Sequence, residues 1–124
     1  MTIGIEKLAR LLKVLGDTNR LGIVITIGIN SRSVTELINM TGLSQTLVSF
    51  HLRALRDAEI VKTKREGPFI FYSLSNPSLI DIIDDLSKMI NKRPQIWKKF
   101  LLHPLAMGWL NKGGNKHVVE RTGR

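Results

Sequence analysis

Apolar residues recur along the first part of the chain at the spacing of α-helices. Over residues 3–15 they lie three or four positions apart and share one helical face, formed by Ile5, Leu8, Leu11, Leu12 and Leu15. Gly16 then ends this helix, and Asp17 is a suitable N-cap for a second one over 18–29. Because the second segment is apolar almost all round, we predict a buried central helix, although its β-branched residues also suit a strand.

Two short helices separated by a tight turn follow. Ser33 and Glu36 have the spacing of a capping box, which predicts a helix over 34–40. Ser44 is placed to cap another helix over 45–57. The inner stripe of that helix is formed by Val48, Leu52 and Leu55. This arrangement has the spacing of a helix-turn-helix.

The pattern then changes to one typical of strands. Residues 60–65 and 69–74 are rich in β-branched and aromatic side chains, and a Glu-Gly-Pro loop separates them, so we predict a β-hairpin. The Asn-Pro pair at 76–77 supplies an N-cap and a first-turn proline for a closing helix over 77–90.

This order of elements is that of a winged helix-turn-helix, a mainly α-helical fold with a β-hairpin wing. We expect residues 1–91 to form one DNA-binding and dimerisation domain. Residues 92–124 are expected to form a basic C-terminal arm, partly helical near 95–102 and 105–110, with a mobile tail.

The net charge narrows the class of partner. The 124 residues include 19 basic and 10 acidic side chains, which gives a net charge of +9 and favours a polyanionic partner: nucleic acid first, an anionic membrane surface second. Much of this excess lies in the C-terminal third, so charge alone does not locate a binding surface in the first ninety residues. No apolar stretch has the length of a membrane span or the form of a signal peptide, so we expect a cytoplasmic protein.

Several kinds of chemistry are excluded by the residue types present. The sequence has no cysteine and therefore offers no disulfide, thiolate metal ligand or cysteine nucleophile. It contains no Gly-rich phosphate loop and no nucleophile elbow. Ser49 and His51 are two positions apart on a predicted helix, so they lie on different faces and do not form a dyad. We predict that the protein is not an enzyme and carries no cofactor.

Four segments resemble the ArsR/SmtB family of prokaryotic repressors. They are LGDTNRL at 15–21, SQTLVSFHLRAL at 44–55, and the pair REG at 65–67 and YSL at 72–74. The second segment is the most specific, and the likeness extends over about 8–90. The resemblance implies a homodimeric winged-helix transcriptional regulator, in our interpretation a repressor that binds a dyad-symmetric operator in double-stranded DNA.

The predicted DNA-binding residues lie on the helix over 45–57 and on the first strand of the hairpin. With the apolar stripe turned inward, Gln45 points outward and is suited to a bidentate contact with adenine. Free amides at the helix start suit a phosphate, and arginines further along suit phosphate clamps. The full set comprises Ser44, Gln45, Thr46, Ser49, His51, Arg53, Arg56, Lys62, Lys64 and Arg65.

Two neighbouring residues on this helix are left undecided by the sequence. His51 lies close to the inner stripe, so it either packs in the core with one hydrogen bond or contacts DNA. Phe50 either is exposed near DNA or lies under the wing.

Metal sensing has little support in the sequence. The thiolate-metal branch of the family carries Cys-x-Cys at the start of the helix before the turn, where this chain has Ser33-Val34-Thr35. On the closing helix, Asp81, Asp84 and Asp85 share one face, but no histidine lies within 76–102. Oxygen-only binding of a hard cation is the alternative, and we prefer a solvated helix face.

The closing helix carries more apolar surface than one core contact needs, and the helix over 3–15 adds a second leucine-rich face. Together they predict a two-fold dimer interface. The alternative function is a winged-helix module for protein or membrane-surface interaction, because the aromatic, leucine and lysine residues of 94–110 suit an interfacial segment.

Overall fold

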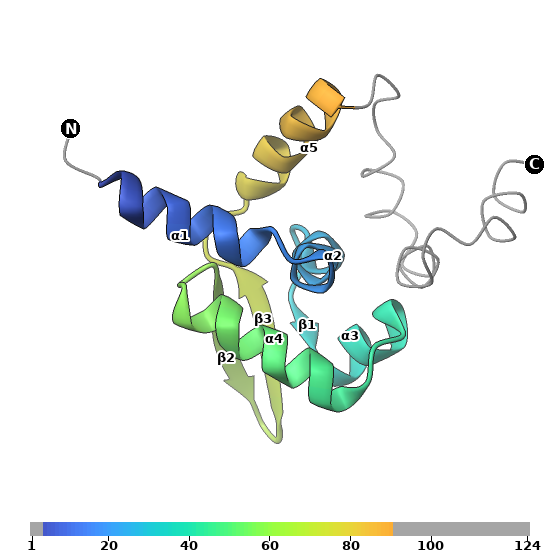
Figure 1. Cartoon of the computed structure of the whole chain (residues 1–124). Helices are drawn as coiled ribbons and strands as arrows, with labels where there is room; N and C mark the ends of the chain where they lie inside the picture. The colour runs from blue at the N-terminus through green and yellow to red at the C-terminus, as the bar shows by residue number, and fades with distance from the viewer. Residues whose placement is uncertain (1–3, 91–124) are drawn as a thin grey trace, which may run out of the picture.

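The computed structural model describes residues 4–90, and Figure 1 shows the arrangement of the elements. The helices and strands follow one another in the order α1 (Ile5–Leu15), α2 (Thr18–Ile27), β1 (Arg32–Ser33), α3 (Val34–Thr41), α4 (Gln45–Asp57), β2 (Val61–Glu66), β3 (Phe69–Leu74) and α5 (Leu79–Ile90). This order confirms the predicted winged helix-turn-helix. The segments predicted near 95–102 and 105–110 lie outside the described residues.

The helix boundaries follow from local capping bonds. The Asp17 carboxylate accepts a hydrogen bond from the backbone N–H of Arg20 at 3.0 Å and thereby starts α2. At the start of α3, the Glu36 side chain accepts from the Ser33 backbone N–H at 2.9 Å, and the Ser33 hydroxyl accepts from the Glu36 backbone N–H at 3.2 Å. The predicted capping box is therefore confirmed. The helix α2 ends at Ile27, two residues before the predicted end, because Gly28 takes a positive φ of 55°.

The core is built around α2, which contacts α1, α3, α4 and β3. Every residue from Gly22 to Ile27 is buried, so the prediction of a central buried helix is confirmed and the strand alternative is wrong. The largest side chains with almost no exposed surface are Ile23, Ile25, Ile27, Leu37, Leu52 and Leu55. They come from three successive helices, so one apolar cluster fixes how α2, α3 and α4 sit against each other.

The three strands form one antiparallel sheet in the order β1-β3-β2. The β2 strand runs one residue later than predicted, from Val61 to Glu66. The strand β1 was not predicted; it consists of two residues that pair with Tyr72 and Phe71. In Figure 1 the β2–β3 hairpin extends away from α1 and α5, and α4 passes across the sheet.

The closing helix α5 begins at Leu79 rather than at the predicted residue 77. The Asn76 side chain accepts hydrogen bonds from the backbone N–H of Ser78 at 3.1 Å and from its hydroxyl at 2.7 Å. These bonds form a turn ahead of the helix, and the Asn76 carbonyl oxygen accepts from the N–H of Leu79. Asn76 therefore organises the turn that leads into α5, three residues before the helix starts.

Replacement of a fully buried side chain of α4 tests this description of the core. Leu55 has no exposed surface, and Leu55→Ala should lower the free energy of unfolding by about 2–5 kcal/mol, because it removes apolar contacts and leaves a cavity. Urea denaturation at fixed protein concentration measures this difference. Ile29→Ala is the control, since Ile29 is 78% exposed and its loss should change stability by less than about 0.5 kcal/mol. Equal effects of the two substitutions would contradict the described packing.

Candidate nucleic-acid interface

The turn between α3 and α4 is held by hydrogen bonds on both sides. The buried Thr41 hydroxyl donates to the Leu37 carbonyl oxygen at 2.6 Å and accepts from the Leu43 N–H at 3.2 Å. Gly42 has a φ of 78°, a conformation that favours glycine. Ser44 then caps α4, because its hydroxyl accepts from the Leu47 N–H at 3.2 Å. These contacts fix the point at which α4 begins and the direction in which it leaves the turn.

The two faces of α4 differ sharply in character. Val48, Leu52 and Leu55 are at most 2% exposed and pack in the core, as predicted. The opposite face is solvent-exposed and mainly polar or basic, although Leu47 and Phe50 are also exposed on α4. Of the predicted binding residues it carries Gln45, Thr46, Ser49, Arg53 and Arg56, with Ser44 exposed just ahead of the helix. The buried stripe therefore holds α4 in place while its polar side chains remain free to contact a partner.

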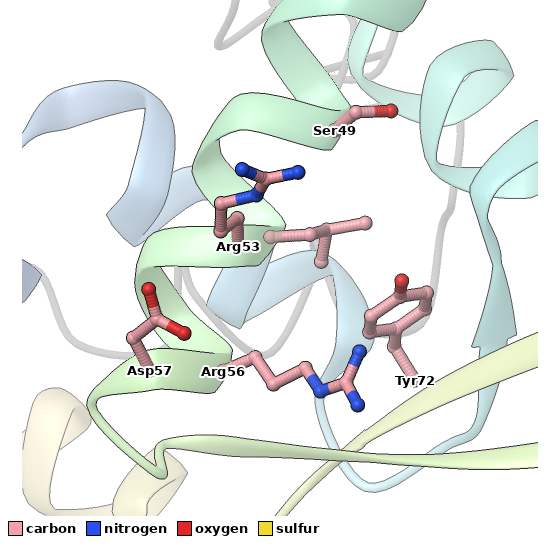
Figure 2. A pocket seen from close by; sticks show the side chains of 6 residues that line it. Ser49, Arg53, Arg56, Asp57 and Tyr72 are labelled. Atoms are coloured by element: carbon pink, nitrogen blue, oxygen red, sulfur yellow. The ribbon is translucent and has the colours of Figure 1, made fainter.

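The second half of α4 borders a surface depression (Figure 2). It is lined by Ser49, Leu52, Arg53, Arg56, Asp57 and Tyr72. The Arg56 side chain extends toward Tyr72, which lies on β3 (Figure 2). Tyr72 was not predicted to lie at the candidate interface, because only the folded chain brings it beside the residues of α4.

The end of α4 leads directly into the wing. The backbone N–H of Glu59 donates to the Arg56 carbonyl oxygen and that of Ile60 to the Leu55 carbonyl oxygen, each at 2.9 Å. Glu59 has a positive φ of 61°. This is the hydrogen-bond pattern of a Schellman motif, which turns the chain from the helix into β2.

The three predicted basic residues of the wing are exposed on β2. Lys62 and Lys64 are two positions apart and lie on one face of the strand, whereas Arg65 lies on the other. The ammonium of Lys64 is 3.5 Å from the Glu66 carboxylate, and both side chains are more than half exposed. This ion pair contributes little to stability. The wing therefore presents basic groups on both of its faces.

Unlike the other predicted residues, His51 is buried. Its Nδ1 lies 3.4 Å from Nη1 of Arg20, and its Nε2 lies 4.0 Å from a carboxylate oxygen of Asp17. Its ring also meets the ring of Phe50 edge-on, with the centroids 5.2 Å apart. Of the two alternatives left open by the sequence, the structure supports the packed histidine. Phe50 itself is 62% exposed, so it does not lie under the wing.

The environment of this cluster shifts two pKa values downward. The backbone N–H of Arg20 lowers the pKa of Asp17 by donating to its carboxylate. Burial opposes this effect, and the nearby His51 and Arg20 side chains reinforce it. Burial lowers the pKa of His51, Asp17 opposes this effect, and Arg20 reinforces it. The imidazole is therefore neutral and the carboxylate charged near pH 7.

The three carboxylates of α5 do not come together as a metal site. In the described part of the chain, no group of three or more His, Cys, Asp or Glu side chains is arranged to hold a metal ion. Asp81 and Asp85 are exposed, but Asp84 is 4% exposed and its carboxylate lies 3.3 Å from the Lys88 ammonium. The interpretation of a solvated face is therefore wrong for Asp84, because α5 turns this residue inward together with Ile80 and Ile83.

None of the helices within residues 4–90 has the length and apolar character needed to cross a membrane. The segment 94–110, on which the membrane-surface alternative depended, lies outside the described residues.

Comparisons with known proteins point to one family. Residues 17–63 match the family model "Bacterial regulatory protein, arsR family". The chain is 32% identical to the arsenical resistance operon repressor of Staphylococcus aureus over 82 residues, which cover 66% of this chain and 79% of the repressor. It is 34% identical to the transcriptional regulator YgaV of Escherichia coli over 85 residues, which cover 68% of this chain and 86% of YgaV. A solved structure of HlyU from Vibrio cholerae has a TM-score of 0.64 at 32% identity and covers 75% of this chain and all of HlyU. These proteins are transcriptional regulators rather than enzymes.

Proposed function

The chain belongs to the arsR family of bacterial regulatory proteins, and we propose that it is a homodimeric, sequence-specific regulator that binds a dyad-symmetric operator and represses transcription. The exposed polar face of α4 carries this proposal, because it is held by a buried apolar stripe and begins at a capped turn. A rigid, exposed first turn with short polar side chains fits into the major groove of DNA.

Each exposed residue of α4 has a role that its chemistry suits. Gln45, in the first turn, forms a bidentate contact with adenine. Thr46 and Ser49 contact base edges or phosphates, and Ser44 lies where the helix N-terminus meets the DNA backbone. Arg53 and Arg56 lie about two to three turns beyond Gln45 and bind phosphates. They position the helix and add affinity, whereas Gln45 supplies base preference.

The wing extends this interface to the neighbouring groove. Lys62 and Lys64 on one face of β2 and Arg65 on the other straddle the phosphates of a minor groove. The buried His51 is not part of the contact surface in this proposal.

The apolar faces of α1 and α5 support the dimer. Ile80 and Ile83 use the inner side of α5 for the core of the domain. Large apolar side chains that remain about half or more exposed are Ile5, Leu8 and Leu12 on α1, and Ile82, Leu86, Met89 and Ile90 on α5. Exposed apolar surface of this extent is typical of an interface between copies. Binding of a dyad-symmetric site requires that the two-fold axis bring the two α4 helices about 34–36 Å apart, one turn of DNA.

In this proposal residues 1–91 are the binding and dimerisation unit, and the basic sequence 92–124 lies outside it. Repression requires only that the dimer occupies DNA needed by the transcription machinery. The Staphylococcus aureus relative is named as a repressor and the Vibrio cholerae HlyU as an activator.

The 124 residues include no cysteine, so thiolate metal sensing has no ligand here.

Selection of bound duplexes from a random DNA pool at about 0.15 M salt tests the proposed function. The wild type should select a dyad-symmetric site, and Gln45→Ala should weaken binding to it by about 1–3 kcal/mol and relax the preference at one position in each half-site. Asn30→Ala, at an exposed position between α2 and β1, is the matched control and should bind as the wild type does. Salt must be held fixed, because phosphate contacts alone give tight binding at low ionic strength. Equal affinity for all sequences would contradict operator recognition.

Sedimentation tests the proposed dimer interface. The wild type should sediment as a dimer at micromolar concentration, and Leu86→Asp should yield a folded monomer, because a charge would be placed in the apolar contact between copies. Asp81→Asn alters an exposed polar position of the same helix and should leave the dimer intact. A stable wild-type monomer would refute this arrangement.

A further inference from the structure

A buried polar cluster joins α4 to the corner between α1 and α2. His51 is 5% exposed although it belongs to the helix that carries the DNA-binding face. Its two ring nitrogens point to different partners: Nδ1 lies 3.4 Å from the Arg20 guanidinium and Nε2 lies 4.0 Å from the Asp17 carboxylate. These partners precede it by about thirty positions in the chain, so the cluster is a tertiary link.

The partner side of this link is itself firmly held. The Arg20 Nε–H donates to the Val14 carbonyl oxygen of α1 at 2.6 Å. The backbone N–H of Arg20 donates to the Asp17 carboxylate at 3.0 Å. Arg20 thus connects the end of α1, the corner and the start of α2. His51 is therefore connected through Arg20 to α1, the helix that carries part of the proposed dimer interface.

The partners fix the protonation state of the imidazole. A guanidinium only donates hydrogen bonds, so Nδ1 of His51 must be the acceptor. The proton of the neutral ring therefore lies on Nε2 and faces the negatively charged Asp17. Protonation adds a hydrogen at Nδ1, which then opposes the N–H of Arg20. Two hydrogen-bond donors and two positive charges, on the imidazolium and on the guanidinium, would then face each other. The contact between His51 and Arg20 is therefore lost.

We propose that His51 is a positioning residue for DNA binding: the neutral imidazole holds α4 against the α1–α2 corner, and operator binding is coupled to the loss of a proton from His51. Asp17 from the corner and Arg20 from α2 are the charged groups that face it. Because α1 carries part of the proposed dimer interface, this link would set the orientation of each α4 relative to the two-fold axis. The proposal rests on the proposed function, since it concerns the geometry of that DNA interface.

The sign of the effect on stability follows from the shifted pKa. The pKa of His51 is below its ordinary value of 6.5 in the folded chain, with burial as the main cause. The unfolded chain therefore binds more protons as the pH falls below about 6.5, and the stability due to neutral His51 is lost as the pH falls through the folded pKa. If DNA binds only the neutral form, it lowers this pKa further.

Titration of the imidazole by NMR, with and without the duplex selected from the random pool, tests the coupling. The pKa of His51 should be lower in the complex than in the free protein. The affinity of the dimer for the duplex should fall as the pH is lowered from about 7.5 to about 5.5. The limit is about a hundredfold per pH unit, because each of the two protomers releases one proton on binding. Far-UV circular dichroism at each pH separates this loss from unfolding.

Three variants distinguish coupling from a purely structural role. Asp17→Asn keeps an N-cap residue but removes the charge that raises the pKa of His51, so the fall in affinity should move to lower pH. His51→Asn retains a hydrogen-bond acceptor and should bind the duplex without this pH dependence. A variant with both His103→Asn and His117→Asn removes the other two histidines and should keep the wild-type profile.

Different failures have different meanings. Tight, sequence-selective binding with the same His51 pKa in the free and bound protein would overturn the coupling and leave the proposed function intact. The coupling is also overturned if His51→Asn keeps the wild-type pH profile. Should His51→Asn not fold, an unmoved midpoint in Asp17→Asn would overturn the coupling in its place. Absence of sequence-selective binding at every pH would overturn both proposals.

Discussion

The burial of the apolar stripe of α4 against α2 is the constraint on which the remaining structure depends. Val48, Leu52 and Leu55 join the same core cluster as Ile23 and Ile27. This packing leaves α4 only one rotation about its axis, the one that exposes its polar and basic side chains. Because protein cores are close-packed, a small rotation would bury charged groups or expose leucines. The position of the candidate interface is therefore a consequence of the core.

Polar contacts then fix the two ends of α4 and its connection to the α1–α2 corner. The Ser44 cap sets where α4 begins, and the hydrogen bonds of Glu59 and Ile60 set where it turns into the wing. Between these ends, His51 ties the helix to Asp17 and Arg20. The same residues that give the chain its family likeness thus have identifiable structural tasks. LGDTNRL contains the two partners of the buried histidine, and SQTLVSFHLRAL contains the cap, the stripe and the histidine itself.

Features that depend on neighbours in the sequence were predictable, and features that depend on distant contacts were not. The capping box of Ser33 and Glu36 acts over three residues, and its prediction is confirmed. The two-residue strand β1 forms only because Tyr72 and Phe71 lie beside it. Likewise, the sequence left His51 undecided because Arg20 lies 31 positions away. Asp84 was wrongly predicted to face solvent because α5 is apolar on much of its circumference. Tertiary contacts alone determine which side of the helix is buried.

Amide chemical-shift mapping of the protein during titration with the selected operator duplex tests the central claim most directly. Shifts should concentrate on 44–56 and on 62–65, and saturation should occur at two chains per duplex. The amide shifts of the buried residues of α2 should change much less, since the core is expected to keep its packing when α4 binds in the groove. Shifts confined to other surfaces, with the first turn of α4 unaffected, would contradict the proposed DNA-binding role of α4.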